Sequence, residues 1–122
     1  MMKSIDARID AIALGSVTLS APVGDGFRQQ QGFGHAALTF ALGDVAAGYA
    51  ALSVIPPEFD VMTAEIKINL LAPAAGHLTA TGRVLKPGKR LVVVSADVWS
   101  EGPDSARKHI AVLQGTMVPV PV

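Results

Sequence analysis

Cysteine is absent from the sequence, and this absence excludes three classes of site at once. The chain can form no disulfide bond, can offer no thiolate to a metal and cannot use a cysteine nucleophile. The three histidines, His35, His77 and His109, are scattered without the regular spacing of metal ligands. We therefore expect no metal site.

Charged side chains are few: they make up 16% of the 122 residues, and ten acidic residues balance ten basic ones. This balance gives no indication of nucleic acid or of an anionic membrane surface as the main partner. Half of the residues are hydrophobic, so we expect one folded domain over residues 1–122, with a real core. The N-terminal stretch MMKSIDARID lacks a long apolar run, so no secretory signal is expected and a cytoplasmic protein is the default interpretation.

Lysine and arginine are missing from residues 29–66, and Asp44 is the one ionised side chain in the most hydrophobic part of that stretch. The alanine-rich and leucine-rich segment predicts one long helix over residues 34–54, which ends before Pro56 because the residue preceding a proline avoids the helical region. A helix that is apolar on all sides must be buried. A membrane span over residues 36–55 has the right length. However, Asp44 would then lie near the bilayer centre, so we expect the rest of the chain to enclose the helix.

The other segments predict antiparallel strands. Residues 61–71 alternate strictly, which puts Met62, Ala64, Ile66, Ile68 and Leu70 on one face of a strand. Further strands are expected at residues 76–85, 91–99 and 109–118, and at 9–23 with an interruption at Gly15. Turns are expected at Glu101–Asp104 and at Lys86-Pro87-Gly88-Lys89, where Pro then Gly is typical of a type II turn.

This order of elements predicts an α+β domain in which a five-stranded antiparallel sheet curves around one long central helix. Small residues on the helix are expected to let the strands approach closely: Ala37, Ala41, Gly43, Ala47, Gly48 and Ala51.

Two motifs stand in the predicted helix, GFGHAA at residues 32–37 and LGDVAAG at residues 42–48. In this order and spacing they resemble the hotdog-fold acyl-CoA thioesterases, and more narrowly the PaaI-like thioesterases of phenylacetate degradation. The helix of those enzymes opens with G-x-x-H-G-G and continues to an aspartate in an A-D-T-A-A-G-like context. The likeness continues through TAEIKINLLAPAAGHLTATGRVLKPGKRLVVVSADVW and the closing HIAVLQGTMV, so it covers nearly the whole chain.

The resemblance implies hydrolysis of an aryl- or medium-chain acyl-CoA to the free acid and CoA, with no separate cofactor. It implies that Asp44 activates water or attacks the thioester directly, and that the N–H groups of Ala36 and Ala37 hold the thioester oxygen. The start of a helix offers such donors and a partial positive charge, and donors aimed at a developing oxyanion are worth a few kcal/mol each. The competing interpretation makes Asp44 a structural carboxylate.

Three further residues match positions of the family's site. His35 is expected to shape the helix start or to contact substrate. Gln29 stands where an asparagine often contacts the attacking water or the thioester, although it could equally belong to a solvated loop. Thr63 matches a serine or threonine that orients the water in the partner's site, with an ordinary strand threonine as the alternative.

Candidate substrate contacts lie on both sides of the helix. Gly34 and Phe33 precede it, and Phe33, Phe40 and Tyr49 are candidate pocket walls or ordinary core. The densest basic cluster surrounds the Pro-Gly turn and either pairs with the phosphates of CoA or is a solvated turn tip; its members are Arg83, Lys86, Lys89 and Arg90.

The family's acid comes from one subunit and its helix start from the neighbour, so a homodimer is expected. Residues 61–71 form the best candidate edge strand to pair with its own copy. Leu91, Val93 and Trp99 form a second apolar face, which predicts a dimer of dimers. The chain departs from the family in having His-Ala-Ala for His-Gly-Gly, and this change leaves a non-catalytic acyl-CoA-binding module as the alternative function.

Overall fold

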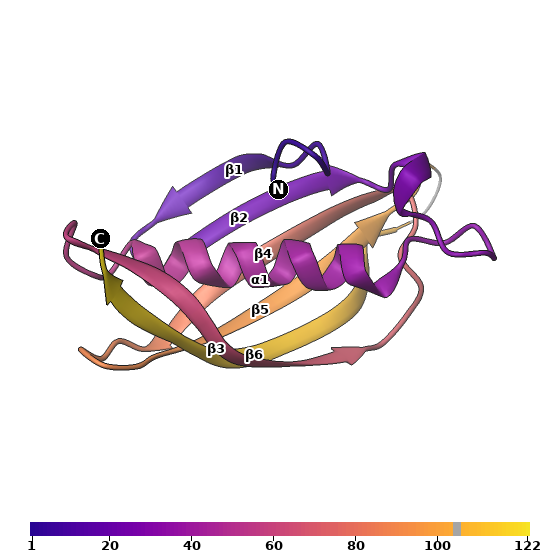
Figure 1. The fold of residues 1–122 in the computed structure, drawn as a ribbon. Helices are drawn as coiled ribbons and strands as arrows, with labels where there is room; N and C mark the ends of the chain where they lie inside the picture. Colours follow the sequence, from indigo (N-terminus) through magenta and orange to yellow (C-terminus); the bar gives the residue numbers. More distant parts are fainter. Residues whose placement is uncertain (104–105) are drawn as a thin grey trace.

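A computed structural model describes residues 1–103 and 106–122. Figure 1 shows one curved sheet that wraps around a single long helix, α1. In chain order the elements are β1 (Arg8–Ala13), β2 (Ser16–Pro22), the short 3-10 helix η1 (Asp25–Phe27), α1 (Ala36–Leu52), β3 (Phe59–Leu70), β4 (His77–Lys86), β5 (Val92–Glu101) and β6 (Lys108–Pro121). The turn expected at Glu101–Asp104 includes Asp104, which lies outside the described residues.

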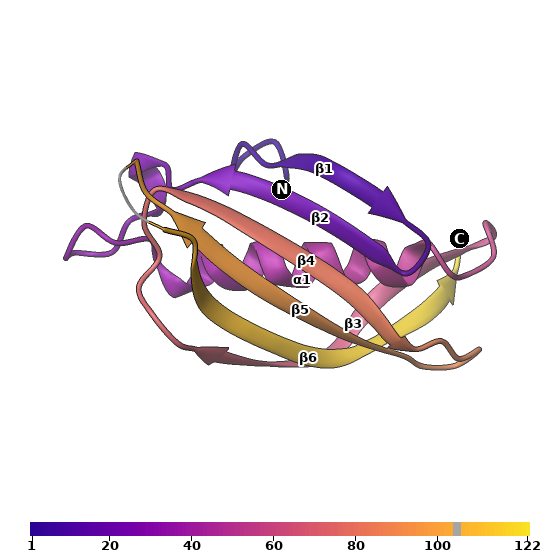
Figure 2. The same cartoon turned by 180° about the vertical axis from the view of Figure 1, so that it is seen from behind.

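The sheet has six antiparallel strands in the order β1-β2-β4-β5-β6-β3, so β1 and β3 form its two edges (Figure 2). The expected count of five was wrong because the segment around Gly15 is a hairpin rather than one interrupted strand. Ala13 pairs with Ser16 across a two-residue turn, and Gly15 has a φ of 76°. That left-handed conformation suits glycine, because a Cβ there is strained.

The inner face of α1 packs against the sheet. Its buried residues are Leu38, Thr39, Ala41, Leu42, Gly43, Ala46, Ala47, Ala50 and Ala51. In the part of the chain that the structure describes, no helix is long and apolar enough to cross a membrane. The sheet covers the inner side of the helix, but Val45 and Tyr49 on the other side are only half-buried and Leu52 is 38% exposed, so the expected enclosure is partial.

Glycine and alanine bring the helix close to the strands at a few specific points. A Cβ added at Gly82 of β4 would lie 2.3 Å from the backbone carbonyl of Ala46 in α1, so this contact is made between two backbones. Gly48 differs from the expectation, because a Cβ there would meet only the Met117 Cε, at 4.0 Å. Gly48 therefore does not serve close packing against the sheet.

These two glycines predict opposite effects of the same substitution. Gly82→Ala is expected to destabilise the protein by about 1–3 kcal/mol, because the new methyl group overlaps helix backbone that cannot move aside. Gly48→Ala is expected to stabilise it by about 0.5–1 kcal/mol, because alanine is the better helix former and the site has room. Urea titrations of the two variants and the wild type measure both differences, and a destabilised Gly48→Ala variant would contradict the packing described above.

Strand β3 departs from the strict alternation predicted for it. Its pairing with β6 shifts register between Thr63 and Glu65, so Ala64 is an extra residue in a β-bulge. A bulge reverses which side chains face the core. Ile66 and Ile68 do pack against the core, but Met62 does not share their face and is 62% exposed. Thr63 points toward the helix instead.

The β4–β5 connection was also predicted incorrectly as a type II turn. Gly88 is not among the glycines with positive φ, which a type II turn requires at its third residue. The link runs over residues 87–91. A Cβ at Gly88 would lie 2.4 Å from the carbonyl oxygen of Leu91, so the glycine allows a close approach of backbone.

Candidate functional site

The start of α1 leaves one backbone donor available. His35 is the N-cap, with φ −63° and ψ 143°, and its Nδ1 accepts a hydrogen bond from the Ala37 N–H at 3.0 Å. The Leu38 N–H donates to the carbonyl of His35 at 2.9 Å. Among the described residues the Ala36 N–H has no acceptor. Of the two amides expected to hold a thioester oxygen, Ala37 is thus engaged by His35 and Ala36 is free.

The capping hydrogen bond also sets the orientation of the His35 ring. Nδ1 accepts from the Ala37 N–H, so Nε2 is the ring nitrogen that is left to donate to other groups. The exposed side chain of His35 therefore presents an N–H donor beside the free amide of Ala36.

A cavity of about 520 Å³, which we term the helix-start cavity, lies in front of this amide. Its lining brings together five of the residues that the sequence singled out, namely Gln29, Phe33, Gly34, His35 and Ala36, with residues 70–74 opposite them. The loop that carries them is held in place by the Gly34 N–H, which donates to the Ala74 carbonyl at 2.8 Å. The Gln29 side-chain oxygen accepts from the Gln31 N–H, so part of this amide is engaged within the loop.

Asp44 lies elsewhere, in a second cavity of about 280 Å³ that we term the carboxylate cavity. Thr63 Oγ1 lies 2.8 Å from Asp44 Oδ1 and donates a hydrogen bond to it, and it lies 3.3 Å from the sulfur of Met117. Asp44 is half-buried. The ion pairs found within residues 1–103 and 106–122 do not include it, so a structural carboxylate neutralised by a base is not what the structure shows.

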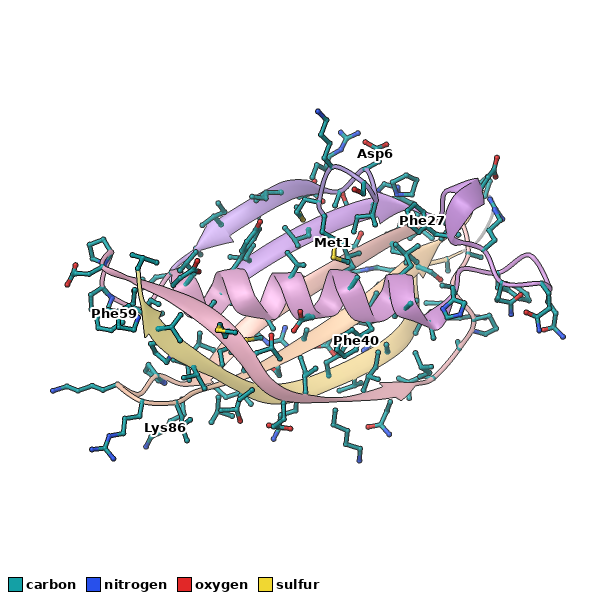
Figure 3. The ribbon with its side chains drawn as sticks, in the orientation of Figure 1. Met1, Asp6, Phe27, Phe40, Phe59 and Lys86 are labelled. Carbon is teal, nitrogen blue, oxygen red and sulfur yellow. The ribbon has the colours of Figure 1, made fainter. Side chains whose placement is uncertain are left out.

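Sequence reasoning found Asp44 and Thr63 but missed three parts of their surroundings. Met117, Val61 and the N-terminal Met1 all line the carboxylate cavity. Figure 3 shows Met1 beside α1, in front of the sheet. No pattern in the sequence signalled these contacts, because they join segments that are far apart along the chain.

The two cavities share no lining residue. Ala36 and Asp44 are eight positions apart on one helix, which corresponds to about 12 Å along its axis. A donor to the thioester oxygen and a group that attacks its carbon must both lie within about 3–3.5 Å of the reacting atoms. Within one chain, Asp44 and Ala36 cannot act on the same thioester.

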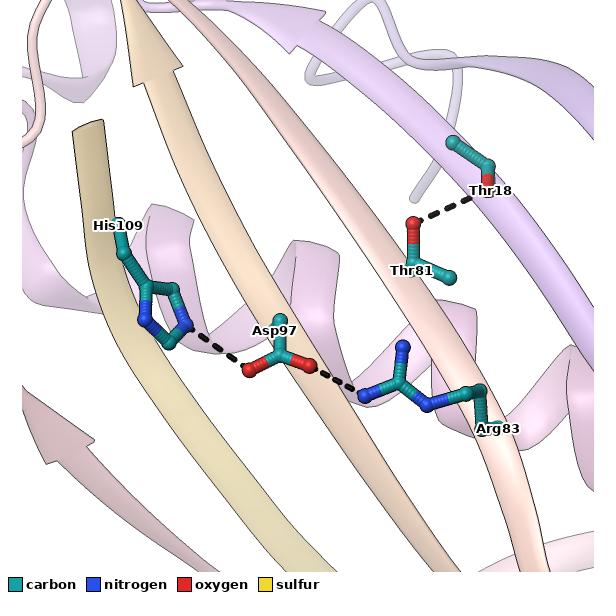
Figure 4. A network of polar contacts seen from close by, with 5 residues as sticks. All are labelled: Thr18, Thr81, Arg83, Asp97 and His109. Atoms are coloured by element: carbon teal, nitrogen blue, oxygen red, sulfur yellow. Dashed lines mark hydrogen bonds and ion pairs between the residues drawn. The ribbon is translucent and has the colours of Figure 1, made fainter. Parts of the chain in front are cut away.

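The expected phosphate-binding residues divide into two groups. Lys86, Lys89 and Arg90 are exposed at the β4–β5 connection, and Figure 3 shows Lys86 at the same end of the molecule as Phe59, away from the helix start. Arg83 lies on the outer face of the sheet and forms an ion pair with Asp97. Asp97 also contacts His109 Nε2 at 2.8 Å (Figure 4).

This outer network changes the interpretation of the second apolar face. Trp99 stacks on His109 with ring centroids 4.4 Å apart, and Arg107 lies over the Trp99 ring at 4.4 Å. Thr18 and Thr81 pair beside them on β2 and β4, at 3.0 Å. The outer face that carries Val93 and Trp99 is therefore mixed rather than apolar. The alternating polar residues of β5 could have indicated it.

The cap at His35 gives a prediction about stability. His35→Ala is expected to cost about 0.5–2 kcal/mol, because the Ala37 N–H loses its acceptor, whereas His35→Asn is expected to stay near the wild type because asparagine is a good N-cap. Guanidinium titrations followed by circular dichroism measure the difference. Equal stability of the alanine and asparagine variants would show that the cap contributes nothing.

Comparison with known sequences agrees with the resemblance to thioesterases that the two motifs of the helix indicated. The sequence model of the family described as the thioesterase superfamily matches residues 31–106. A protein of Saccharolobus solfataricus that is named provisionally as an esterase is 30% identical over 98 residues, which are 80% of this chain and 69% of that protein.

Solved structures agree with the fold. A thioesterase family protein from Silicibacter pomeroyi is 34% identical with a TM-score of 0.96, covering 99% of this chain and 89% of that one. A Streptococcus mutans protein bound to acetyl CoA is 25% identical with a TM-score of 0.83, covering 94% and 89%. The Escherichia coli PaaI protein from the phenylacetic acid degradation operon has a TM-score of 0.87, covering 98% and 83%, and at 21% identity its likeness shows the fold alone. The predicted hotdog architecture is thus confirmed, with six strands.

Proposed function

Because the chain belongs to the thioesterase superfamily and is a thioester hydrolase, we propose that it hydrolyses acyl-CoA in a site completed by two copies of itself. The observation that carries this proposal is the separation of the Asp44–Thr63 pair from the free Ala36 N–H. The carboxylate cavity holds the proposed base, and the helix-start cavity holds the donor for the oxyanion. Acetyl CoA bound to the Streptococcus mutans relative supports the substrate class.

The proposed reaction joins the two halves around one carbonyl group. Asp44 of one copy takes a proton from a water molecule, whose oxygen attacks the thioester carbon. The oxyanion that forms is held by the Ala36 N–H of the other copy, where the helix start adds partial positive charge. The tetrahedral intermediate then collapses, the carbon–sulfur bond breaks, and the proton held by Asp44 passes to the leaving sulfur, so that CoA leaves as the thiol and the carboxylate is restored. In the alternative mechanism the Asp44 carboxylate attacks the thioester carbon directly. Water then hydrolyses the mixed anhydride that this attack forms.

Thr63, His35 and Gln29 have supporting roles in this scheme. The Thr63 hydroxyl donates to Asp44 Oδ1, which leaves Oδ2 to face the water. The Nε2–H of His35 provides a second donor near Ala36, and the Gln29 amide lines the same cavity. The alanines that replace the family's Gly-Gly keep their backbone N–H groups, so the donor at position 36 survives the change.

The partner copy is proposed to join at β3. This strand is an edge of the sheet, so its outer backbone groups are available to pair with another strand. Pairing of two β3 strands would join the sheets and set the two α1 helices side by side. Two such dimers are proposed to associate into a tetramer. Lys86, Lys89 and Arg90 are proposed to bind the phosphates of CoA.

A screen of acyl-CoA esters with detection of free thiol tests the proposed function. Turnover of at least one aryl- or medium-chain ester is expected, together with a light-scattering mass of two or four chains. Saturable CoA binding by calorimetry without thiol release would contradict hydrolysis. A mass equal to one chain during turnover would contradict the shared site.

A further inference from the structure

Next to the carboxylate cavity lies another cavity that the proposed reaction does not explain. This neighbouring cavity has a volume of about 320 Å³ and is lined by Ile9, Ile12, Val17, Tyr49, Leu52 and Ser53. Tyr49 and Leu52 line both cavities. We term the two together the acyl groove. It runs along α1 from Asp44 to Ser53, under the β1 edge of the sheet.

Strand β1 gives this groove its apolar far end. Residues 9 and 12 of a regular strand would face opposite sides, because side chains alternate. The register with β2 shifts between Ile9 and Ala11, and this bulge puts Ile9 opposite the buried Leu19 and Ile12 opposite the buried Val17. Both isoleucines therefore face the helix side of the sheet, yet they are 47% and 68% exposed. The fold holds apolar side chains beside α1 without covering them.

We propose that the acyl groove binds an unbranched acyl chain of medium length, an inference that rests on the proposed function. The reason is adjacency: the far cavity shares Tyr49 and Leu52 with the cavity of the proposed catalytic carboxylate, and no charged residue lines it. Nine helix positions separate Asp44 from Ser53, or about 13 Å. An extended chain advances about 1.2 Å per bond, as extended backbone does, so the groove matches about ten carbons.

Gly48 controls passage along this groove. It lines the carboxylate cavity, one turn after Asp44 and one turn before Leu52. A Cβ at this position would have no contact closer than 4.0 Å. The missing side chain thus keeps the groove open between the reaction centre and its far end, and a large side chain there would close it.

Steady-state rates with saturated acyl-CoA esters of two to sixteen carbons test the proposal. In the wild type, kcat/KM is expected to rise by about fourfold per methylene group up to about ten carbons, and then to level off or fall. Gly48→Leu is expected to lower kcat/KM for decanoyl-CoA by a much larger factor than for acetyl-CoA, so that the rise beyond four or five carbons is lost. Gly48→Ala adds far less volume at the same position and should lower the decanoyl-to-acetyl ratio of kcat/KM much less. Ile12→Asn should also lower this ratio, because it makes the far end of the groove polar.

Several results would overturn the proposal. One is a flat chain-length profile in the wild type, or a faster reaction with benzoyl-CoA than with decanoyl-CoA. Another is a Gly48→Leu variant that loses acetyl and decanoyl turnover equally. A loss of oligomer mass in Ile12→Asn would show that a second copy occupies the groove instead. Failure of the proposed function itself would look different, because no ester of any length would then be hydrolysed.

Discussion

Replacing Asp44 by asparagine is expected to lower kcat for acyl-CoA hydrolysis by about 10²–10⁴-fold, the usual contribution of a positioned general base. The amide has the size of the carboxylate and can still accept from Thr63, so the fold and the cavity are preserved. What it loses is the ability to take a proton from water or to attack the thioester. The KM is expected to change much less than kcat.

Asp60→Asn is the matched control for this prediction. Asp60 lines the same carboxylate cavity, but it is exposed, and within the described residues its Oδ1 accepts from the Val61 N–H alone. It is expected to retain turnover within about threefold of the wild type, since exposed charges contribute little. Full activity of Asp44→Asn, with a normal circular dichroism spectrum, would refute the assignment of Asp44.

Replacing Ala36 by proline is expected to lower kcat by about 10²–10³-fold, the typical effect of losing one oxyanion donor. Ala36 is the first residue of α1, where proline is well tolerated because the N–H has no helical acceptor. His35 already has the extended backbone that a following proline requires, with ψ at 143°. The substitution therefore deletes one N–H group and leaves the helix in place.

Ala36→Gly is the control, because it restores the family's residue and keeps the N–H. Its turnover should equal or exceed that of the wild type. Thermal unfolding of the proline variant near the wild-type temperature, together with a kcat loss, would support the donor role. An Ala36→Pro variant that is stable and fully active would exclude it.

Sequence patterns were sufficient for most of the fold because these elements are fixed by local chemistry. The single helix followed from an apolar run that Pro56-Pro57 ends, and it does end at Leu52. The edge position of β3 agrees with the prediction that this segment would be unpaired on one side. The errors were at Gly15, Ala64 and Gly88, where the outcome depended on backbone conformation. A hairpin, a bulge and a longer turn all satisfy the same pattern of residue types.

The site was predictable only in part, because the distances between its residues depend on backbone and side-chain conformation. The helix-start residues and Asp44 could be named from their motifs, but their division between two cavities follows from helix geometry. The contact between Thr63 and Asp44 depends on the bulge at Ala64, since strict alternation would have turned Thr63 to the other face. The hydrogen bond from the Ala37 N–H to His35 depends on the side-chain conformation of His35, which the sequence does not specify.

The claim that the site is shared between copies is tested most directly by mixing two inactive variants. Asp44→Asn retains an intact helix start, and Ala36→Pro retains an intact carboxylate. After equal amounts are unfolded together and refolded, half of the dimers contain one chain of each kind, and each such dimer has one complete site. Activity is then predicted to recover to about a quarter of the wild-type value, given a symmetric dimer. Activity that stays at the level of the parent variants, although mass spectrometry of differently tagged chains shows mixed dimers, would contradict the shared site.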